Sequence, residues 1–440
     1  MSVRIGPHPA LDVAGGGGRA PSRLDRLAMR GVARGLEGLG EGRLEFLLPD
    51  GRTLALGRGR PGDAPGGAWR PGAAPLPVRI TVHDWSFFRR VLLEGGTGAG
   101  GAYIDGLWSC DDLVALIGLV AERGLRLEDT VPLTRLGGLA NRVAHRVRRN
   151  TVRRARGNIA AHYDLGNDFY ALWLDPSMTY SCAVFEHPGQ TLEAAQRNKY
   201  RTIAEKARLR PGQRVLEIGC GWGGFMEYAA SAHGCHVTGI TLSAPQASYA
   251  RDRLRRAGLE ERAKIEIVDY RRIEGKFDRI VSIEMLEAVG HEYLGDFFAA
   301  CDRALAPDGL AAVQVITIPD ARYEDYRRGV DYTQRYIFPG SHLPSLGALA
   351  AALAATTLQL EDLENIGVHY AETLRRWRIR FLEQAARVRD LGFEDRFLRR
   401  WEYYLAYCEA GFLTRHLNDL QLVLTRAGNP DLPPGPRARD

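Results

Sequence analysis

The sequence predicts an α/β protein with a doubly wound, Rossmann-like sheet of seven strands, the last one antiparallel, and a smaller N-terminal α/β domain. From about residue 158 onward, short apolar segments alternate with helical patterns, as in sheets whose parallel strands are joined by crossover helices. The first of these segments breaks into closely spaced glycines, where such folds bind a ligand at the carboxyl ends of their strands. The segments that we assign to strands are Arg214–Gly219, His236–Thr241, Lys264–Val268, Phe277–Ile283, Leu310–Ile318 and, as the closing antiparallel strand, Gln421–Thr425.

The N-terminal part contains weaker signals for a small mixed α/β domain. A helix is expected around Ser22–Leu36, and Pro49-Asp50-Gly51 lies between two apolar stretches, which is a hairpin signal. Val78–Val82 and a helix capped by Ser86 continue the pattern. By composition we divide the chain into a Gly/Pro-rich region with the hairpin (1–77), a small domain (78–134), an arginine-rich linker helix (135–157), the large α/β domain (158–428) and a flexible tail (429–440).

Composition narrows the functional class. Of the 440 residues 45% are hydrophobic and 25% charged, as in globular proteins, and the net charge is +6. The six cysteines show no C-x-x-C spacing, so we expect neither disulfides nor a metal site, and a cytoplasmic location. Residues 337–360 lack charges but contain prolines, glycines and many alanines, which favours a core helix capped near Ser345 over a membrane span. We expect no signal peptide.

The glycine turn carries the first functional signal. Gly219, Gly221 and Gly223 allow a sharp backbone bend and the close approach of a nucleotide-sized ligand. The spacing differs from that of the dinucleotide fingerprint, and Glu217 lies two residues before the first glycine. A carboxylate there favours a cationic ligand such as S-adenosylmethionine over a pyrophosphate. An ordinary tight turn in another α/β protein is the alternative.

Longer motifs extend this interpretation. The order of these motifs along the chain resembles that of the cyclopropane-fatty-acyl-phospholipid synthases, including their plant-type and mycolic-acid-modifying relatives, over about residues 78–428. Several motifs in one order carry the resemblance, which makes it specific. They are residues 87–92 (FFRRVL), 103–108 (YIDGLW), 162–169 (HYDLGNDF), 180–183 (YSCA), 286–290 (LEAVG), 336–340 (YIFPG) with 343–345 (LPS), and 367–370 (GVHY).

The resemblance implies a Rossmann-like methyltransferase domain, a lipid-associated domain before it, and an enzyme that adds a methylene across an acyl double bond of a membrane phospholipid. The alkene attacks the sulfonium methyl of S-adenosylmethionine, and the resulting carbocation must lose a proton in a dry site. In the family the proton acceptor is a bound bicarbonate. Carried over by motif, Cys182, Glu287 and Tyr370 contact it through side chains and Ile316 through its backbone. The same carbocation could instead give a methylene-branched or methyl-branched chain, or capture water.

One position departs from the family pattern. Many members have His where this chain has Gln314, and an amide can hold an anion but cannot take up a proton. His291 and His369 are nearby in sequence, and a structural role is the ordinary interpretation of each. Cys182 and Tyr370 could likewise be plain core residues, and Glu287 a surface carboxylate. The residues expected around S-adenosylmethionine, besides the glycine turn and Glu217, are Tyr180, Ser181, Thr241, Leu242, Gln246, Asp269 and Tyr270; for the last two we expect contacts with the adenine.

The arginine-rich segment suggests a membrane surface. Residues 135–156 carry eight arginines with apolar residues near helical spacing, which favours an interfacial helix that docks transiently on anionic lipid over a linker or a nucleic-acid arm. We therefore expect peripheral association with the inner face of the membrane, no nucleic acid, and an assembly that could be a homodimer. Two rival classes are a methyltransferase for a non-lipid substrate and a non-catalytic lipid-binding protein. The first lacks sequence features for reading nucleic acid, and the second does not explain the catalytic motifs.

Overall fold

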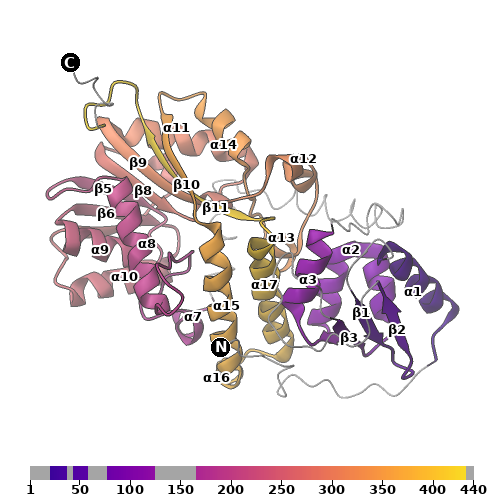
Figure 1. Ribbon diagram of the computed structural model, residues 1–440. Helices are drawn as coiled ribbons and strands as arrows, with labels where there is room; N and C mark the ends of the chain where they lie inside the picture. The colour runs from indigo at the N-terminus through magenta and orange to yellow at the C-terminus, as the bar shows by residue number, and fades with distance from the viewer. Residues whose placement is uncertain (1–19, 37–42, 58–76, 124–164, 433–440) are drawn as a thin grey trace. The chain divides into compact units, whose positions relative to one another are not determined.

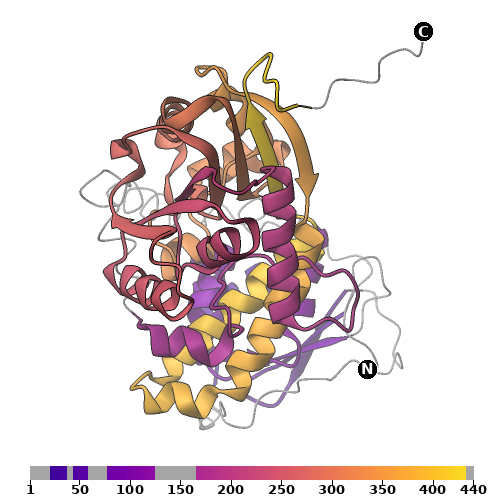
Figure 2. The same cartoon turned by 90° about the vertical axis from the view of Figure 1, so that its left-hand side faces the viewer.

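The computed structural model describes residues 20–36, 43–57, 77–123 and 165–432. Its chain forms two compact units, which are drawn in Figures 1 and 2. Of the described residues, those of the first unit are 20–36, 43–57, 77–123, 325–339 and 371–417, and those of the second are 165–324, 340–370 and 418–432. The arginine-rich segment and the first three residues of the motif at 162–169 lie outside the described residues.

The first unit has a four-stranded sheet in the order β2-β1-β3-β4. The predicted hairpin is present, because β1 and β2 pair antiparallel, and β1 then pairs parallel with β3. Helix α17 packs against α2 and α3, and the Tyr103 hydroxyl donates to Glu402 at 2.8 Å. The elements are α1 (Arg23–Leu36), β1 (Leu44–Leu47), β2 (Thr53–Leu56), β3 (Val78–Val82), α2 (Ser86–Ile104), β4 (Trp108–Cys110), α3 (Leu113–Glu122), α13 (Tyr332–Tyr336), α15 (Gly367–Glu383, from its second turn on), α16 (Ala385–Asp390) and α17 (Asp395–Leu413).

These groupings differ from the division made by composition. The boundary at residue 77 separates β1 from β3, although the two strands are hydrogen-bonded neighbours. The helices of residues 371–417 belong to the first unit because the buried side of α17 packs there. Ser86 was expected as a helix cap, but it is the first residue of α2; its amide and hydroxyl both donate to Asp84 instead.

The second unit is built on a seven-stranded sheet in the order β10-β11-β9-β8-β5-β6-β7. The pairs β5–β6, β6–β7, β5–β8 and β8–β9 are parallel, and β11 is antiparallel to β9, which confirms the predicted fold class. The strands are β5 (Arg214–Ile218), β6 (His236–Thr241), β7 (Ala263–Ile267), β8 (Phe277–Ile283), β9 (Leu305–Thr317), β10 (Gln359–Asn365) and β11 (Asn418–Thr425).

Helices cover both faces of this sheet. Apolar residues of α8, α9 and α10 form one buried cluster with Val215, Val237 and Val281, and those of α11 and α14 form another with Leu216, Ile280 and Val313 (Figures 1 and 2). The two faces of the same strands are therefore both buried, as a doubly wound sheet requires. The helices are α7 (Asn167–Trp173), α8 (Leu192–Lys206), α9 (Gly224–His233), α10 (Ala244–Arg256), α11 (Leu294–Ala304) and α14 (Leu346–Leu353), and α12 (Asp320–Arg328) follows β9.

Strand β10 was not expected from the sequence. Its residues, Gln-Leu-Glu-Asp-Leu-Glu-Asn, are mostly exposed and carry three carboxylates, so they lack the apolar signal of a core strand. It is an edge strand that pairs antiparallel with β11, and charges are common on such edges because they discourage further pairing. The uncharged stretch at 337–360 contains α14, whose cap Ser345 accepts from the Ala348 amide at 3.2 Å, as predicted.

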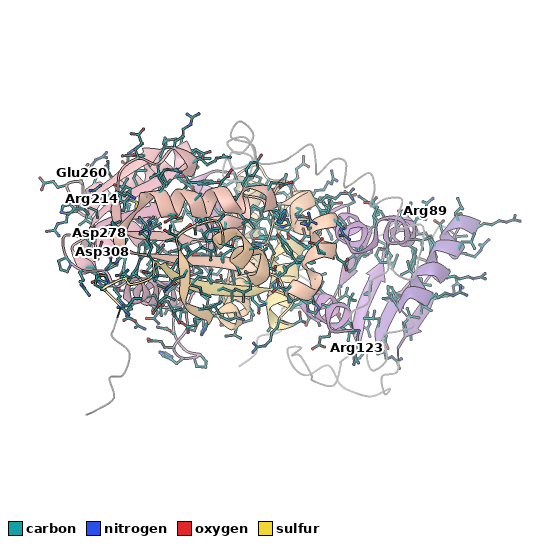
Figure 3. All side chains as sticks on the ribbon, turned by 90° about the horizontal axis from the view of Figure 1, so that it is seen from above. Arg89, Arg123, Arg214, Glu260, Asp278 and Asp308 are labelled. Carbon is teal, nitrogen blue, oxygen red and sulfur yellow. The ribbon has the colours of Figure 1, made fainter. Side chains whose placement is uncertain are left out.

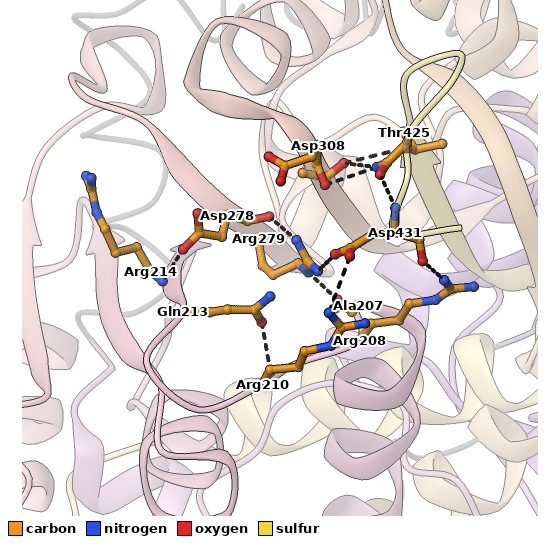
Figure 4. Close-up of polar contacts among 12 residues, drawn as sticks. Ala207, Arg208, Arg210, Gln213, Arg214, Asp278, Arg279, Asp308, Thr425 and Asp431 are labelled. Carbon is orange, nitrogen blue, oxygen red and sulfur yellow. Dashed lines mark hydrogen bonds and ion pairs between the residues drawn. The ribbon is translucent and has the colours of Figure 1, made fainter. Parts of the chain in front are cut away.

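The amino ends of the central strands are held by ionic contacts. Figure 3 shows Arg214, Asp278 and Asp308, from the starts of β5, β8 and β9, at one edge of the sheet. Nearby, the buried guanidinium of Arg279 donates to the Ala207 and Asp278 carbonyls at 2.7 Å each and pairs with Asp431 (Figure 4). Because the strands are parallel, their carboxyl ends lie at the opposite edge, where a ligand is expected. In the part of the chain described, no helix is long and apolar enough to cross a membrane.

Candidate active site

The glycine turn follows β5 as the sequence predicts. Gly219, Gly221 and Gly223 have φ of 84°, 50° and 80°, a region that side chains with a Cβ rarely adopt. A Cβ on Gly219 would lie 2.6 Å from Met285 Cγ, so this position also needs glycine for space. Helix α9 begins at Gly224, directly after the turn. The turn thus brings backbone N–H groups and a helix start to the carboxyl end of the first central strand.

Glu217 is a buried carboxyl group at the base of this turn. Its side chain is 3% exposed, and Oε2 has no hydrogen-bond partner within the described ranges. Burial raises the pKa of Glu217 to about 8, and the positive charge of Lys199 opposes the rise. A buried carboxyl oxygen that lacks a partner fits a cationic ligand, which would favour its ionised form. This observation supports the expected fit to S-adenosylmethionine.

The other predicted cofactor residues surround the ends of β6 and β7. Thr241 and Gln246 are buried and contact each other at 3.3 Å, and Leu242 between them along the chain is half-buried. Asp269 is held by Arg271 through bonds of 2.8 and 2.6 Å to its two carboxylate oxygens. Tyr270 packs against Phe297 in an edge-on contact. The position of this pair at a strand end agrees with the expectation, but Asp269 already has an ionic partner.

A second set of polar groups lies at the ends of β8 and β9. The carboxylate of Glu284 accepts three hydrogen bonds: from the Cys182 amide at 2.7 Å, from Gln314 Nε2 at 2.8 Å and from the Tyr370 hydroxyl at 2.6 Å. Three residues that the resemblance assigned to bicarbonate therefore meet, and they surround a carboxylate of the chain itself. Glu284 was not identified from the sequence.

Two further carboxyl groups adjoin Glu284. Glu287 accepts from the Ile316 amide at 2.5 Å, and Asp419 accepts from Gln314 Nε2 at 2.9 Å. One oxygen of each has no hydrogen-bond partner among the residues the structure describes. Burial and the charge of Glu284 raise the pKa of Glu287 to about 8, and the same two causes raise that of Asp419 well above its usual range. The neutral form of Glu287 therefore predominates at neutral pH, and burial shifts Asp419 towards its neutral form as well.

Lys199 links the two parts of the site. It is fully buried, and its Nζ donates to Ser181 Oγ at 2.7 Å. Burial lowers the pKa of Lys199 to about 8, while the charges of Glu284 and Glu217 act in the opposite direction. Met285, the residue after Glu284, lies against Gly219, so the glycine turn and the Glu284 group adjoin each other. Tyr180, next to Ser181, packs against Tyr170 and Trp173.

The remaining residues near the site have structural partners. Burial raises the pKa of the Cys182 thiol well above its usual range, and the thiol donates to the Ala183 carbonyl at 3.2 Å, so Cys182 contributes its amide and not a thiolate. His369 Nδ1 accepts from the Phe185 amide at 3.3 Å. His291 contacts the Tyr323 hydroxyl at 2.7 Å. Both histidines therefore have the structural partners that the ordinary interpretation assumed.

Sequence reasoning missed Glu284, Asp419 and Lys199. Glu284 directly follows β8, and a polar residue at the end of a central parallel strand is a signal that could have drawn attention to it. Asp419 is the second residue of β11 and comes from a distant part of the chain. Lys199 lies on α8 in a sequence with several other charges. Only tertiary contacts distinguish these two from ordinary surface residues.

Comparison with known proteins supports a common ancestry over most of the chain. The family model described as mycolic acid cyclopropane synthetase matches residues 150–422. Tuberculostearic acid methyltransferase UfaA1 of Mycobacterium tuberculosis is 40% identical over 81% of this chain and 86% of its own length. The cyclopropane-fatty-acyl-phospholipid synthase of Escherichia coli is 38% identical over 81% of this chain and 89% of its own.

Solved structures agree with these sequence relatives. The cyclopropane synthase MmaA2 of Mycobacterium tuberculosis matches with a TM-score of 0.58 and 31% identity, over 62% of this chain and 98% of that one. The mycolic acid cyclopropane synthase CmaA1, solved in complex with SAH and CTAB, matches with a TM-score of 0.58 and 30% identity over the same shares. The family resemblance drawn from the motifs is confirmed.

Proposed function

Because the chain belongs to the mycolic acid cyclopropane synthetase family, we propose that it transfers a methylene from S-adenosylmethionine to the double bond of an unsaturated acyl chain in a membrane phospholipid, giving a cyclopropane fatty acid. The protein is an S-adenosylmethionine-dependent methyltransferase of the cyclopropane-fatty-acyl-phospholipid synthase type. Methylene transfer to a lipid follows from that class. The phospholipid and the ring are the finer parts of the proposal.

The observation that carries this proposal is the buried carboxylate group beside the glycine turn. When bound, S-adenosylmethionine supplies an electrophilic sulfonium methyl; the glycine turn and Glu217 would hold it. The reaction places a positive charge on an alkyl chain, so the protein must exclude water and offer negative charge close by. Glu284 and its donors meet both needs, because the carboxylate is enclosed by Cys182, Gln314 and Tyr370. A lipid-binding protein without catalysis has no use for this arrangement.

The carbocation can give either a cyclopropane ring or a methylene branch, and the enzyme's activity is named after the product that forms. The two similar relatives differ in name, one for methyl transfer and one for a cyclopropane product. Loss of a proton from the new methyl closes the ring, whereas a hydride shift before that loss gives a methylene branch. The description of the matching family model names a cyclopropane synthetase, which favours the ring as the product.

The test is fatty-acid analysis of a host that expresses the chain. Gas chromatography with mass spectrometry should show acyl chains heavier than the host's unsaturated ones by one CH2 group. Mild catalytic hydrogenation then separates the products, because it reduces an exocyclic methylene and leaves the ring. Purified enzyme should act on unsaturated phospholipid vesicles and not on the free fatty acid. Unchanged host lipids, with the protein present and able to bind S-adenosylmethionine, would refute the proposal.

A bilayer substrate requires contact with a membrane surface. We assign this contact to the arginines of residues 135–156, which lie outside the described part of the chain. Neutralising Arg146, Arg148, Arg149, Arg153 and Arg154 should weaken sedimentation with anionic vesicles, and added salt should do the same for the native chain. The matched control neutralises exposed arginines of α10, such as Arg255 and Arg256. Equal sedimentation of both variants with the native chain would exclude the segment from docking.

A further inference from the structure

We propose that the carboxylate of Glu284 is the proton acceptor of this enzyme and takes the place of the bicarbonate expected from the resemblance. This inference rests on the proposed function, because it concerns the proton that leaves the alkyl cation. It departs from the expectation at one point only: the base belongs to the chain and is not a dissolved anion. Four lines of observation support it.

The first is the set of donors. An anion site offers N–H and O–H groups that converge on one position, and here an amide N–H, a side-chain amide and a phenol do so. The three donors are Cys182, Gln314 and Tyr370, which are three of the residues expected to hold bicarbonate. All three bonds, of 2.6 to 2.8 Å, end on the two oxygens of Glu284. A carboxylate and bicarbonate present the same pair of oxygens, so one substitutes for the other at this position.

The second line of observation is the backbone conformation of Glu284. Its φ is 50°, in the left-handed region that residues other than glycine seldom occupy. The conformation costs on the order of 1 kcal/mol or more and persists only where surrounding contacts fix it. Its own amide donates to the Gln314 carbonyl at 2.8 Å, which continues the contacts of β8 with β9 past the end of β8. The strained backbone thus directs the carboxylate towards the three donors, as is common at functional sites.

The third line of observation is the distribution of charge among the groups around Glu284. Glu284 faces Cys182, Lys199, Glu287, Tyr370 and Asp419. Three donors converge on Glu284, whereas the donor at Glu287 is the Ile316 amide and the side-chain amide donor at Asp419 is Gln314, which is shared with Glu284. Hydrogen bonds to a carboxylate favour its charged form, so the negative charge of this group resides on Glu284. Lys199 supplies the compensating positive charge.

The fourth is basicity. Burial raises the pKa of Glu284 above its usual value, and the bonds from Tyr370 and Cys182 oppose the rise. A carboxylate with a raised pKa is a better proton acceptor near neutral pH than an exposed one.

The proposed step balances without another reactant. The alkene forms a bond to the methyl carbon while the carbon–sulfur bond breaks. The electron pair of that bond stays on the sulfur of the departing S-adenosylhomocysteine, and the other alkene carbon becomes cationic. A C–H bond of the new methyl then breaks. Its electron pair closes the three-membered ring, and its proton passes to an oxygen of Glu284, which becomes a carboxylic acid. The proton returns to solvent after the product leaves.

The experiment compares carbonate dependence in the native enzyme and two variants. Assays are run with phospholipid vesicles in buffer depleted of carbon dioxide, with and without added bicarbonate or formate. Glu284→Gly removes the carboxylate, accepts the φ of 50° without strain and leaves the three donors around the vacated position. Glu284→Gln keeps the volume but cannot accept the proton. Glu261→Gln, on an exposed glutamate before β7, is the matched control.

The native enzyme should be indifferent to bicarbonate. Both Glu284 variants should lose about a hundredfold or more of turnover in depleted buffer. Added bicarbonate or formate should restore Glu284→Gly, which has room for the anion, and should leave Glu284→Gln inactive. Calorimetric titration with S-adenosylmethionine and thermal unfolding verify that each variant is folded and binds the cofactor.

Two outcomes would overturn the inference. The first is a native enzyme whose turnover falls when carbon dioxide is removed and recovers when bicarbonate is added. This result does not require that any variant folds. The other is a Glu284→Gln enzyme with native turnover. Either outcome leaves the proposed function intact as long as the native enzyme makes the heavier acyl chain. Absence of that product in the native enzyme would refute the function itself.

Discussion

Gln314 offers the sharpest test of how the polar group at the end of β9 works. Its amide is fully buried and makes three hydrogen bonds. Nε2 donates to Glu284 at 2.8 Å and to Asp419 at 2.9 Å, and Oε1 accepts from Gln421 at 3.1 Å. Gln314→Leu keeps nearly the same volume, so it removes these bonds without opening a large cavity.

The expected loss follows from those three contacts. Glu284 keeps the bonds from Cys182 and Tyr370, but the Asp419 carboxyl loses its side-chain amide donor, and the Gln421 amide loses its acceptor. Leaving a buried polar group without its partner costs about 1–3 kcal/mol. If that cost falls on the transition state, turnover drops by roughly one to two powers of ten. Gln314→His can still donate one N–H to Glu284, so we expect it to retain most activity.

The assay is turnover of phospholipid vesicles, paired with thermal unfolding to detect a cost in stability. A Leu variant with reduced stability but native turnover would assign Gln314 to the core. A Leu variant equal to the native protein in both measurements would refute the reasoning about the buried hydrogen bonds. If the His variant changes the ratio of cyclopropane to methylene-branched product, then Gln314 also influences which product the carbocation forms.

Three further predictions concern single side chains. Glu287→Gln should bind S-adenosylmethionine nearly normally in calorimetry and lose most turnover, because the contacts of Glu287 are with the Ile316 amide and the Glu284 group, whereas Glu217 is the carboxyl group at the base of the glycine turn. Glu217 has a pKa of about 8 and is protonated at pH 7, so binding of a cation should release about one proton. The affinity for S-adenosylmethionine should therefore rise with pH up to about 8. Calorimetry in buffers of different ionisation enthalpy should show the proton release, and Glu217→Gln should abolish it. Asp431→Ala should destabilise the fold by about 2 kcal/mol in urea unfolding, because it leaves the buried Arg279 without its carboxylate.

Each of these has a contradicting result. Native turnover of Glu287→Gln would remove Glu287 from the site. Equal proton release by Glu217→Gln and the native enzyme would show that another group titrates on binding. For Asp431, the matched control is Asp308→Ala at the same edge of the sheet (Figure 4); Asp308 accepts from Asn429 through its backbone carbonyl, and its side chain forms no ion pair within the described residues. Equal stability of the two variants would mean that solvent replaces the Asp431 carboxylate at Arg279.

The sequence determined the features that depend on local pattern. The buried parallel strands β5, β6 and β8 are short segments that contain Val, Leu or Ile, and the turn after β5, where φ is positive, is built from glycines, so both could be predicted. The edge strand β10 was missed because an exposed, charged strand has no apolar signal. The resemblance located Cys182, Gln314 and Tyr370 because they lie within long motifs.

Only the tertiary structure decided which group Cys182, Gln314 and Tyr370 surround. Cys182, Glu284, Gln314, Tyr370 and Asp419 come from five separate segments, and hydrogen bonds between segments distant in the chain leave no trace in periodicity or composition. The sequence shows that donors for an anion are present. Only the folded chain shows that Glu284 already receives them, because the direction of its side chain depends on a positive φ and on the hydrogen bond of its amide to the Gln314 carbonyl of β9.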